Sequence, residues 1–264
     1  MPYPTYSIVI PAYNEAARIG NALEAVVGCI HQRGWSAEIV VVDDGSRDQT
    51  ADLVRAFAKD HPEVRLLQNP GNHGKGYSVR NGMLNARGEI LLFSDADFSS
   101  PIYESLKLIA AIEEGADVAF GSRWLLAETQ TQRQSLLRQF VGRAYNLVLR
   151  LVLGLPYKDT QCGFKACTRQ AAEVMFTRQQ IEGWGFDPEL LFIARRFGLR
   201  MTEVAVEWAN DDRSKINPIV DGVKMFYELL TIRFNGVTGR YERPTFQFFA
   251  ATPGTILVGD KHLA

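Results

Sequence analysis

The sequence predicts an α/β fold in which helices cover both faces of a parallel sheet. Short apolar runs rich in β-branched residues recur along the first 125 residues, and each run ends in polar or acidic residues. Stretches with the 3.6-residue apolar period of amphipathic helices separate these runs. Strands that are apolar throughout are buried on both faces, as in parallel sheets sandwiched between helices.

The expected elements follow one another in a regular order in the first half of the chain. The expected strands are residues 6–11, 37–46, 64–69, 89–97 and 116–123. The expected helices are residues 15–33, 50–59, 75–86 and 101–114. Ligands of parallel sheets bind beyond the carboxyl ends of the strands, so the polar residues there are the candidate site. These strand ends are residues 11–15, 43–46, 69–76, 95–97 and 121–123.

The second half is less regular. Its expected elements are one or two helices at 130–153, a helix near 168–176, a strand at 200–208 and a helix at 217–233. We assign no secondary structure to the segment that begins at Gly236 and is rich in Gly, Thr, Pro and Phe.

Composition excludes several classes of protein. The formal net charge of −1 gives no overall attraction to nucleic acid, and the four histidines form no zinc motif. Three cysteines without a CxxC pair suit a reducing compartment. The first 16 residues lack the features of a signal peptide, and no apolar window has the length of a membrane span. These observations favour a cytoplasmic protein of undetermined oligomeric state.

The segment "NPGNHGKGYSVR" at residues 69–80 suggests a loop that holds phosphate. A P-loop requires Gly, four residues, and then Gly-Lys-Ser/Thr, but Asn69 and Gly76 occupy the first and last of these positions. A P-loop is therefore excluded. Lys75 remains at an expected helix start, where amide groups and the helix dipole favour an anion. An ordinary glycine turn with a solvated lysine is the alternative.

Acidic residues end two of the expected strands. Asp95 and Asp97 follow a buried strand, and a turn between them lets both carboxylates converge on one Mg²⁺ or Mn²⁺ ion. The alternative is a helix cap formed by Asp97. Asp43 ends another strand, where its carboxylate is suited to accept a hydrogen bond from a base N–H or to stabilise a turn.

Taken together, these segments resemble a known family. "SIVIPAYNEAARI", "IVVVDDGSRDQT", "NHGKGYSVRNGMLNARGEILLFSDADFSSP" and "VAFGSR" resemble the nucleotide-binding half of family 2 inverting glycosyltransferases. "DTQCGFKAC", "EGWGFDPELLFIARRFG" and "VAVEW" resemble the dolichyl-phosphate β-glucosyltransferase branch of that family. The resemblance covers residues 7–233. Eukaryotic members carry an N-terminal membrane anchor, which we do not expect in this chain.

The resemblance implies a GT-A fold, in which the sheet is mostly parallel but of mixed direction. We expect one catalytic domain at 1–239, with a nucleotide-binding half at about 5–125, an acceptor half at about 126–239, and a tail of unassigned role at 240–264. The resemblance implies that seven residues bind the nucleotide-sugar: Pro11, Tyr13, Glu15, Asp43, Lys75, Asp95 and Asp97. Asp43 is expected to read uracil, and Asp97, with Asp95, to hold the metal.

The implied reaction is metal-dependent transfer of glucose, with inversion, from UDP-glucose to a polyprenyl phosphate. Arg123, Asp159 and Asp187 are the expected catalytic residues. Arg133, Arg138 and Lys165 are expected to bind the acceptor phosphate, since cations offset its charge. A lipid acceptor implies a peripheral protein on the cytoplasmic face of a membrane. Another donor, such as GDP-mannose or UDP-GlcNAc, or a non-phosphate acceptor remains the alternative, and no nucleic-acid partner is expected.

Overall fold

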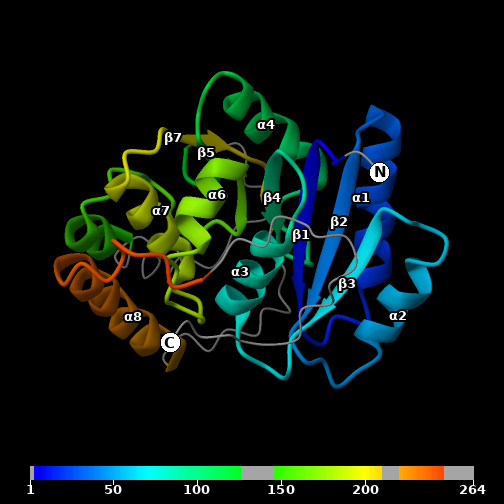
Figure 1. Cartoon of the computed structure of the whole chain (residues 1–264), viewed down its shortest axis with the longest axis horizontal. Coiled ribbons are helices and arrows are strands. Elements are labelled where there is room, and N and C mark those ends of the chain that lie inside the picture. The colour runs from blue at the N-terminus through cyan, green and yellow to red at the C-terminus, as the bar shows by residue number, and fades with distance from the viewer. Residues whose placement is uncertain (1–2, 126–145, 210–219, 247–264) are drawn as a thin grey trace.

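The computed structural model describes residues 3–125, 146–209 and 220–246, which form a central sheet covered by helices on both faces (Figure 1). Its strands are β1 (Tyr6–Ala12), β2 (Ala37–Asp43), β3 (Val64–Gln68), β4 (Ile90–Ser94), β5 (Val118–Ser122), β6 (Phe164–Thr168) and β7 (Met201–Ala205). Its helices are α1 (Ile19–Arg33), α2 (Thr50–Phe57), α3 (Lys75–Asn85), α4 (Ser105–Glu113), α6 (Arg169–Phe176), α7 (Phe186–Arg196) and α8 (Val220–Val237). A short 3₁₀ helix, η1 (Ile102–Glu104), precedes α4, and residues 146–153 are also helical.

The sheet has the order β3-β2-β1-β4-β6-β5-β7. β1, β2, β3 and β4 are mutually parallel, and β7 runs parallel to β5. β6 lies between β4 and β5 and runs antiparallel to both. The mostly parallel sheet of mixed direction is therefore confirmed.

Most expected elements are present, with three differences in the second half, the first of which is that α7 was not among the expected helices. β6 was not expected as a strand, because the charged Lys165 at its second position hides the apolar character of a buried five-residue segment. The last helix continues to Val237, four residues beyond its expected end. The expected helical segment at 130–153 is described only from residue 146, and residues 247–264 of the tail lie outside the described residues.

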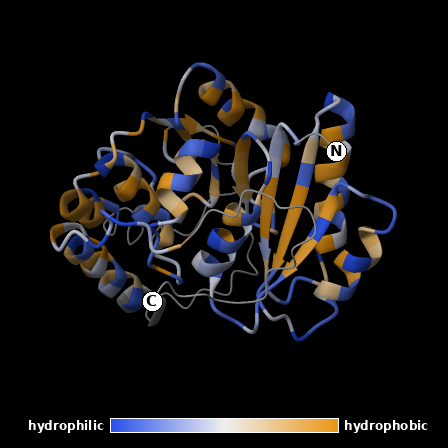
Figure 2. Ribbon diagram, in the orientation of Figure 1, coloured by the Kyte–Doolittle hydropathy of each residue, from blue (hydrophilic) through white to orange (hydrophobic). Residues whose placement is uncertain are grey.

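Alternation along the strands divides the core into two layers. Ile8 and Ile10 of β1 pack on the face covered by α1 and α4, whereas Val9 packs on the face covered by α3, α6 and α7. Most residues of the strands are accordingly apolar (Figure 2), although the outer strands β3 and β7 each include a charged residue, Arg65 and Glu203. Helices cover both faces of the sheet, so a ligand can reach it only at the ends of the strands. The polar residues at the carboxyl ends of the strands are therefore the candidate site.

The segment between α6 and α7 joins the two halves of the chain. The side-chain amide of Gln179 donates to the carbonyl oxygen of Gly76 at 2.9 Å, and the Tyr77 N–H donates to that of Glu182 at 3.2 Å. The first turn of α3 is therefore fixed against residues that lie about 100 positions later in the chain. Within the described ranges, no helix is both long and apolar enough to cross a bilayer.

Candidate active site

A cleft of about 770 Å³ lies where β1, β4 and β5 end. Eight residues proposed from the sequence line it: Pro11, Tyr13, Glu15, Lys75, Asp95, Asp97, Arg123 and Asp187. Three others, Asp43, Asp159 and Lys165, are nearly fully buried and do not line it. Arg133 and Arg138 lie outside the described residues.

A tight turn after β4 brings two carboxylates into the cleft. The Phe98 N–H donates to the carbonyl oxygen of Asp95 at 3.1 Å, and Phe98 has a positive φ of 46°. The Ser99 N–H donates to Oδ1 of Asp97 at 2.9 Å, which fixes that side chain. Burial raises the pKa of the Asp97 carboxyl, and the nearby charge of Asp95 raises it further.

This pair fits a divalent cation. Two oxygen-rich, partly desolvated carboxylates repel one another, and a bound Mg²⁺ or Mn²⁺ ion relieves that repulsion. Within the described part of the chain, no group of three or more His, Cys, Asp or Glu side chains could hold a metal. The two aspartates alone would leave several coordination positions for water and for phosphate oxygens of a ligand.

Lys75 supplies a fixed positive charge beside these carboxylates. Its Nζ lies 2.6 Å from Oδ1 of Asp95 and 5.3 Å from the centre of the Trp184 ring. Burial acts to lower the pKa of the ammonium, but Asp95 and Asp187 outweigh it, and the pKa lies above its usual value. Lys75 is therefore charged at neutral pH and lies where a diphosphate would need a counter-ion.

Two amide groups just before α3 have a partner within the protein. The N–H groups of His73 and Gly74 donate to the Asp44 carboxylate at 3.1 and 2.8 Å, and Asn69 Nδ2 donates to it at 2.7 Å. Asp44 thus occupies the anion position expected for a phosphate at this helix start. The positive contribution of this loop to the cleft comes from Lys75.

Asp43 lies beneath the cleft rather than on its wall. Its side chain is 1% exposed and accepts hydrogen bonds from the Ser46 N–H and the Gln68 side-chain amide, both at 3.3 Å. A base could reach this carboxylate only after a rearrangement of these residues. The role of Asp43 in reading uracil stays a prediction.

Arg123 and Asp159 form an ion pair at the end of β5, in which Asp159 is buried and the Arg123 side chain is 21% exposed. Nε and Nη2 of Arg123 donate to the two carboxylate oxygens of Asp159 at 2.6 and 2.9 Å, and the Arg123 N–H donates at 3.0 Å. Burial acts to raise the pKa of Asp159, but Arg123 outweighs it and holds the pKa below its usual range. This geometry gives Asp159 the role of orienting Arg123. Its catalytic role stays a prediction.

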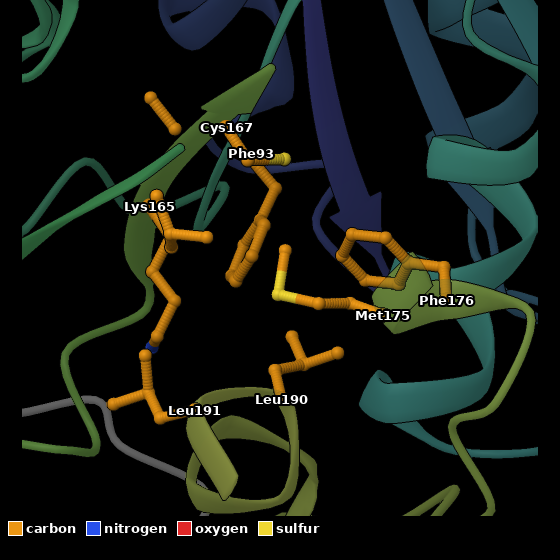
Figure 3. Close-up of a pocket in the computed structure, with 9 residues that line it drawn as sticks. Phe93, Lys165, Cys167, Met175, Phe176, Leu190 and Leu191 are labelled. Carbon is orange, nitrogen blue, oxygen red and sulfur yellow. The ribbon is translucent and has the colours of Figure 1, made fainter. Parts of the chain in front are cut away.

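Asp187 and Lys165 form a second buried ion pair, with side chains 5% and 3% exposed. Nζ of Lys165 also donates to the carbonyl oxygen of Cys162 at 2.6 Å. The Lys165 side chain runs beside a small apolar cavity of about 10 Å³ lined by Phe93 and Leu191, among others (Figure 3). The structure thus places Lys165 behind Asp187, and its binding of acceptor phosphate stays a prediction.

Sequence reasoning did not single out Gly163, which makes room for Asp95. A Cβ at Gly163 would lie 2.4 Å from Oδ2 and 2.8 Å from Cγ of Asp95. The φ angle of Gly163 is not among the positive ones, so its backbone alone does not require glycine. Only the fold brings the segment before β6 against the turn after β4, so the sequence carried no local signal for this contact.

Replacing Gly163 with alanine should displace the Asp95 carboxylate and reduce the activity of the site by about 100-fold. The fold should survive, because the added methyl group meets a side chain rather than backbone. Turnover and the thermal midpoint, compared with those of Gly28→Ala, test this. A Cβ at Gly28 has nothing within 4 Å. Unchanged turnover in the Gly163 variant would contradict the placement of Asp95.

Comparison with known proteins adds independent information. The model of the family described as "Glycosyl transferase family 2" matches residues 7–176. Dolichyl-phosphate beta-glucosyltransferase of Drosophila melanogaster is 35% identical over 254 residues, covering 91% of this chain and 78% of that protein. The enzyme of the same name from Saccharomyces cerevisiae is 34% identical over 253 residues, covering 89% and 76%.

Solved structures show the same fold. Glucosyl-3-phosphoglycerate synthase from Mycobacterium tuberculosis, in complex with Mn²⁺, UDP-glucose and phosphoglyceric acid, has a TM-score of 0.65 to this chain. The similarity covers 91% of this chain and 81% of that one, at 21% sequence identity. At this identity the likeness concerns the fold alone.

Proposed function

The chain belongs to glycosyl transferase family 2, and we propose that it transfers glucose from UDP-glucose to a polyprenyl phosphate of the dolichyl type. The observation that carries this proposal is the acidic turn at Asp95 and Asp97, which lies beside the Lys75 ammonium in the large cleft. The relatives' shared name supports glucose as the sugar and dolichyl phosphate as the acceptor.

In the proposed reaction, an oxygen of the acceptor phosphate attacks the anomeric carbon as the bond from that carbon to the diphosphate breaks. UDP leaves with the electron pair, and attack from the opposite side inverts the configuration. Asp97 and Asp95 would hold Mg²⁺ or Mn²⁺, which neutralises charge that develops on the diphosphate. Lys75 adds a second, permanent positive charge next to Asp95.

The state of the carboxylates favours an acceptor that needs no general base. Asp159 is ion-paired with Arg123, and Asp187 with Lys165. An alcohol acceptor must lose a proton to a base during attack, whereas a phosphate monoester, with a second pKa near 6, is already largely a dianion at pH 7. Arg123 lines the cleft and supplies a planar cation suited to phosphate.

The outer face of α8 supports a lipid acceptor. Its exposed large apolar residues are Phe226, Tyr227, Leu230, Phe234 and Val237, which share one side of the helix. The same helix brings Lys224 and Met225 to the cleft. An apolar helix face close to an active site is suited to lie in the interface of a bilayer that holds the acceptor.

Replacing both Leu230 and Phe234 with glutamate should weaken binding to vesicles of anionic phospholipid by at least about ten-fold. The physical reason is the loss of two apolar side chains, 46% and 58% exposed, from the face that contacts lipid. Co-sedimentation with vesicles measures the effect, with Thr231→Glu as the control because Thr231 is exposed beside this face. Equal binding by both variants would contradict the assignment.

A direct assay tests the proposed function. The purified chain, incubated with UDP-glucose, Mn²⁺ and polyprenyl phosphate in detergent, should form a glucosyl lipid and release UDP. Free polyprenol in place of the phosphate should give no product. GDP-mannose and UDP-GlcNAc serve as donor controls. Preferential use of either donor, or glucosylation of a non-phosphate acceptor, would overturn the proposal in favour of another family 2 activity.

A further inference from the structure

The segment between α6 and α7 brings an aromatic side chain to the cleft. Trp184 stands between Gly183 and Gly185 and lines the cleft together with Lys75. The Lys75 ammonium lies 5.3 Å from the centre of the indole ring, within the range of a cation–π contact. Any displacement of Trp184 would therefore change the surroundings of the lysine that pairs with Asp95.

Carboxylates from two helices hold this segment at its two ends. Glu189 of α7 accepts hydrogen bonds from the N–H groups of Gln180 and Ile181, both at 2.9 Å. Glu228 of α8 accepts one from the N–H of Gly185 at 2.8 Å. Glu189 is fully buried and belongs to the core, whereas Glu228 lies one turn after Lys224, which lines the cleft.

The two glycines beside Trp184 are explained by Glu228. A Cβ at Gly183 would lie 2.2 Å from Oε1 of Glu228, and a Cβ at Gly185 would lie 2.7 Å from Oε2 and 2.9 Å from Cβ of the same residue. Gly185 has a φ of −76°, and Gly183 is not among the residues with positive φ. Close approach of the Glu228 side chain, rather than backbone conformation, therefore requires glycine at both positions.

We infer that Glu228 is a positioning residue, which holds Trp184 against Lys75 through the Gly185 amide. On this assignment α8 forms part of the donor side of the cleft as well as the face proposed to meet lipid. The inference predicts a change in KM for the glucosyl donor, and this prediction rests on the proposed function. It also predicts a change in the order of residues 180–186, which does not depend on that function.

Hydrogen exchange of residues 180–186 tests the structural consequence without any substrate. In Glu228→Ala the amide of Gly185 loses its acceptor and should exchange at least about ten-fold faster. Glu228→Gln keeps a carbonyl oxygen at the same position and should restore protection. Glu242→Ala is the control, because Glu242 pairs with Arg196 on an exposed surface. Unchanged exchange in Glu228→Ala would overturn the inference.

Kinetics test the consequence for the site. Glu228→Ala should raise the KM for UDP-glucose about ten-fold with a smaller change in kcat, and Glu228→Gln should return KM to near the wild-type value. An unchanged KM, or a glutamine variant no better than the alanine variant, would overturn the positioning role. If the wild-type protein uses no UDP-glucose, the proposed function fails, but the exchange result still decides whether Glu228 orders this segment.

A double-mutant cycle gives a second, independent test. The methyl group of Gly183→Ala meets the flexible end of Glu228 and should push the carboxylate away from Gly185. Gly183→Ala should therefore reproduce the exchange rate of Glu228→Ala, and the double variant should be no worse than either single variant. Additive effects of the two substitutions would contradict a shared mechanism.

Discussion

Replacing Asp97 with asparagine is expected to lower the rate of glucosyl transfer by about 1,000-fold, a loss of ~4 kcal/mol of transition-state stabilisation. The Ser99 N–H can still donate to the asparagine oxygen, so the turn after β4 should keep its shape. What is lost is the negative charge that would hold the divalent cation at the leaving diphosphate. The thermal midpoint of the variant should stay close to that of the wild type.

A binding measurement separates loss of metal from other causes. UDP with Mn²⁺ should raise the thermal midpoint of the wild type, because a ligand that binds the native state stabilises it. In Asp97→Asn the additional shift due to Mn²⁺ should disappear. Asp60→Asn, at an exposed position, serves as the control. A variant that keeps both the manganese effect and normal turnover would exclude Asp97 as a metal ligand.

Removing the Asp159 carboxylate should have the second large effect. Asp159→Ala leaves the Arg123 guanidinium without the two oxygens that hold it, and breaking this ion pair, in which Arg123 is 21% exposed, should cost about 2 kcal/mol of unfolding free energy. The Asp159 side chain is 2% exposed. The exposed pair of Arg55 and Asp52 is the matched control, and Asp52→Ala should cost less than about 1 kcal/mol.

Turnover then shows whether Asp159 acts through Arg123 or acts directly. If it only orients the guanidinium, Arg123→Met and the double variant with Asp159→Ala should be almost equally slow. A direct catalytic role would make the double variant slower than either single variant by the product of their effects. Urea unfolding and steady-state rates of the four proteins provide both measurements.

The donor half of the fold could be predicted from sequence because its signals are local. A strand such as Ile39–Val42 is apolar throughout, and the acids that follow it mark its carboxyl end. The rule that ligands bind beyond such ends placed Lys75, Asp95 and Arg123 together, and all three line one cleft. No contact between distant segments had to be known for that result.

The rest depends on contacts between distant segments. Asp43 and Asp44 are adjacent acids, and only the backbone path decides which faces the cleft; Asp44 lines it, and Asp43 does not. Lys165 was expected to bind the acceptor phosphate, but it lies inside β6 and pairs with Asp187. Glu228 lies 43 residues after Gly185, whose N–H donates a hydrogen bond to it, so no sequence pattern indicates this contact.

Because β6 runs opposite to its neighbour β5, the chain between them begins and ends at the same edge of the sheet. Arg123 and Asp159 are 36 residues apart but hydrogen-bonded, so the chain leaves the sheet after β5 and returns to it at the same point before β6. β5 and β6 pair directly, although this excursion separates them along the chain. Leu149, Leu153 and Leu155 anchor the described part of this excursion in the hydrophobic core, whereas Lys75 at the start of α3 and Asp95 after β4 lie outside it. The excursion and the strands of the first half are thus separate along the chain but share one hydrophobic core.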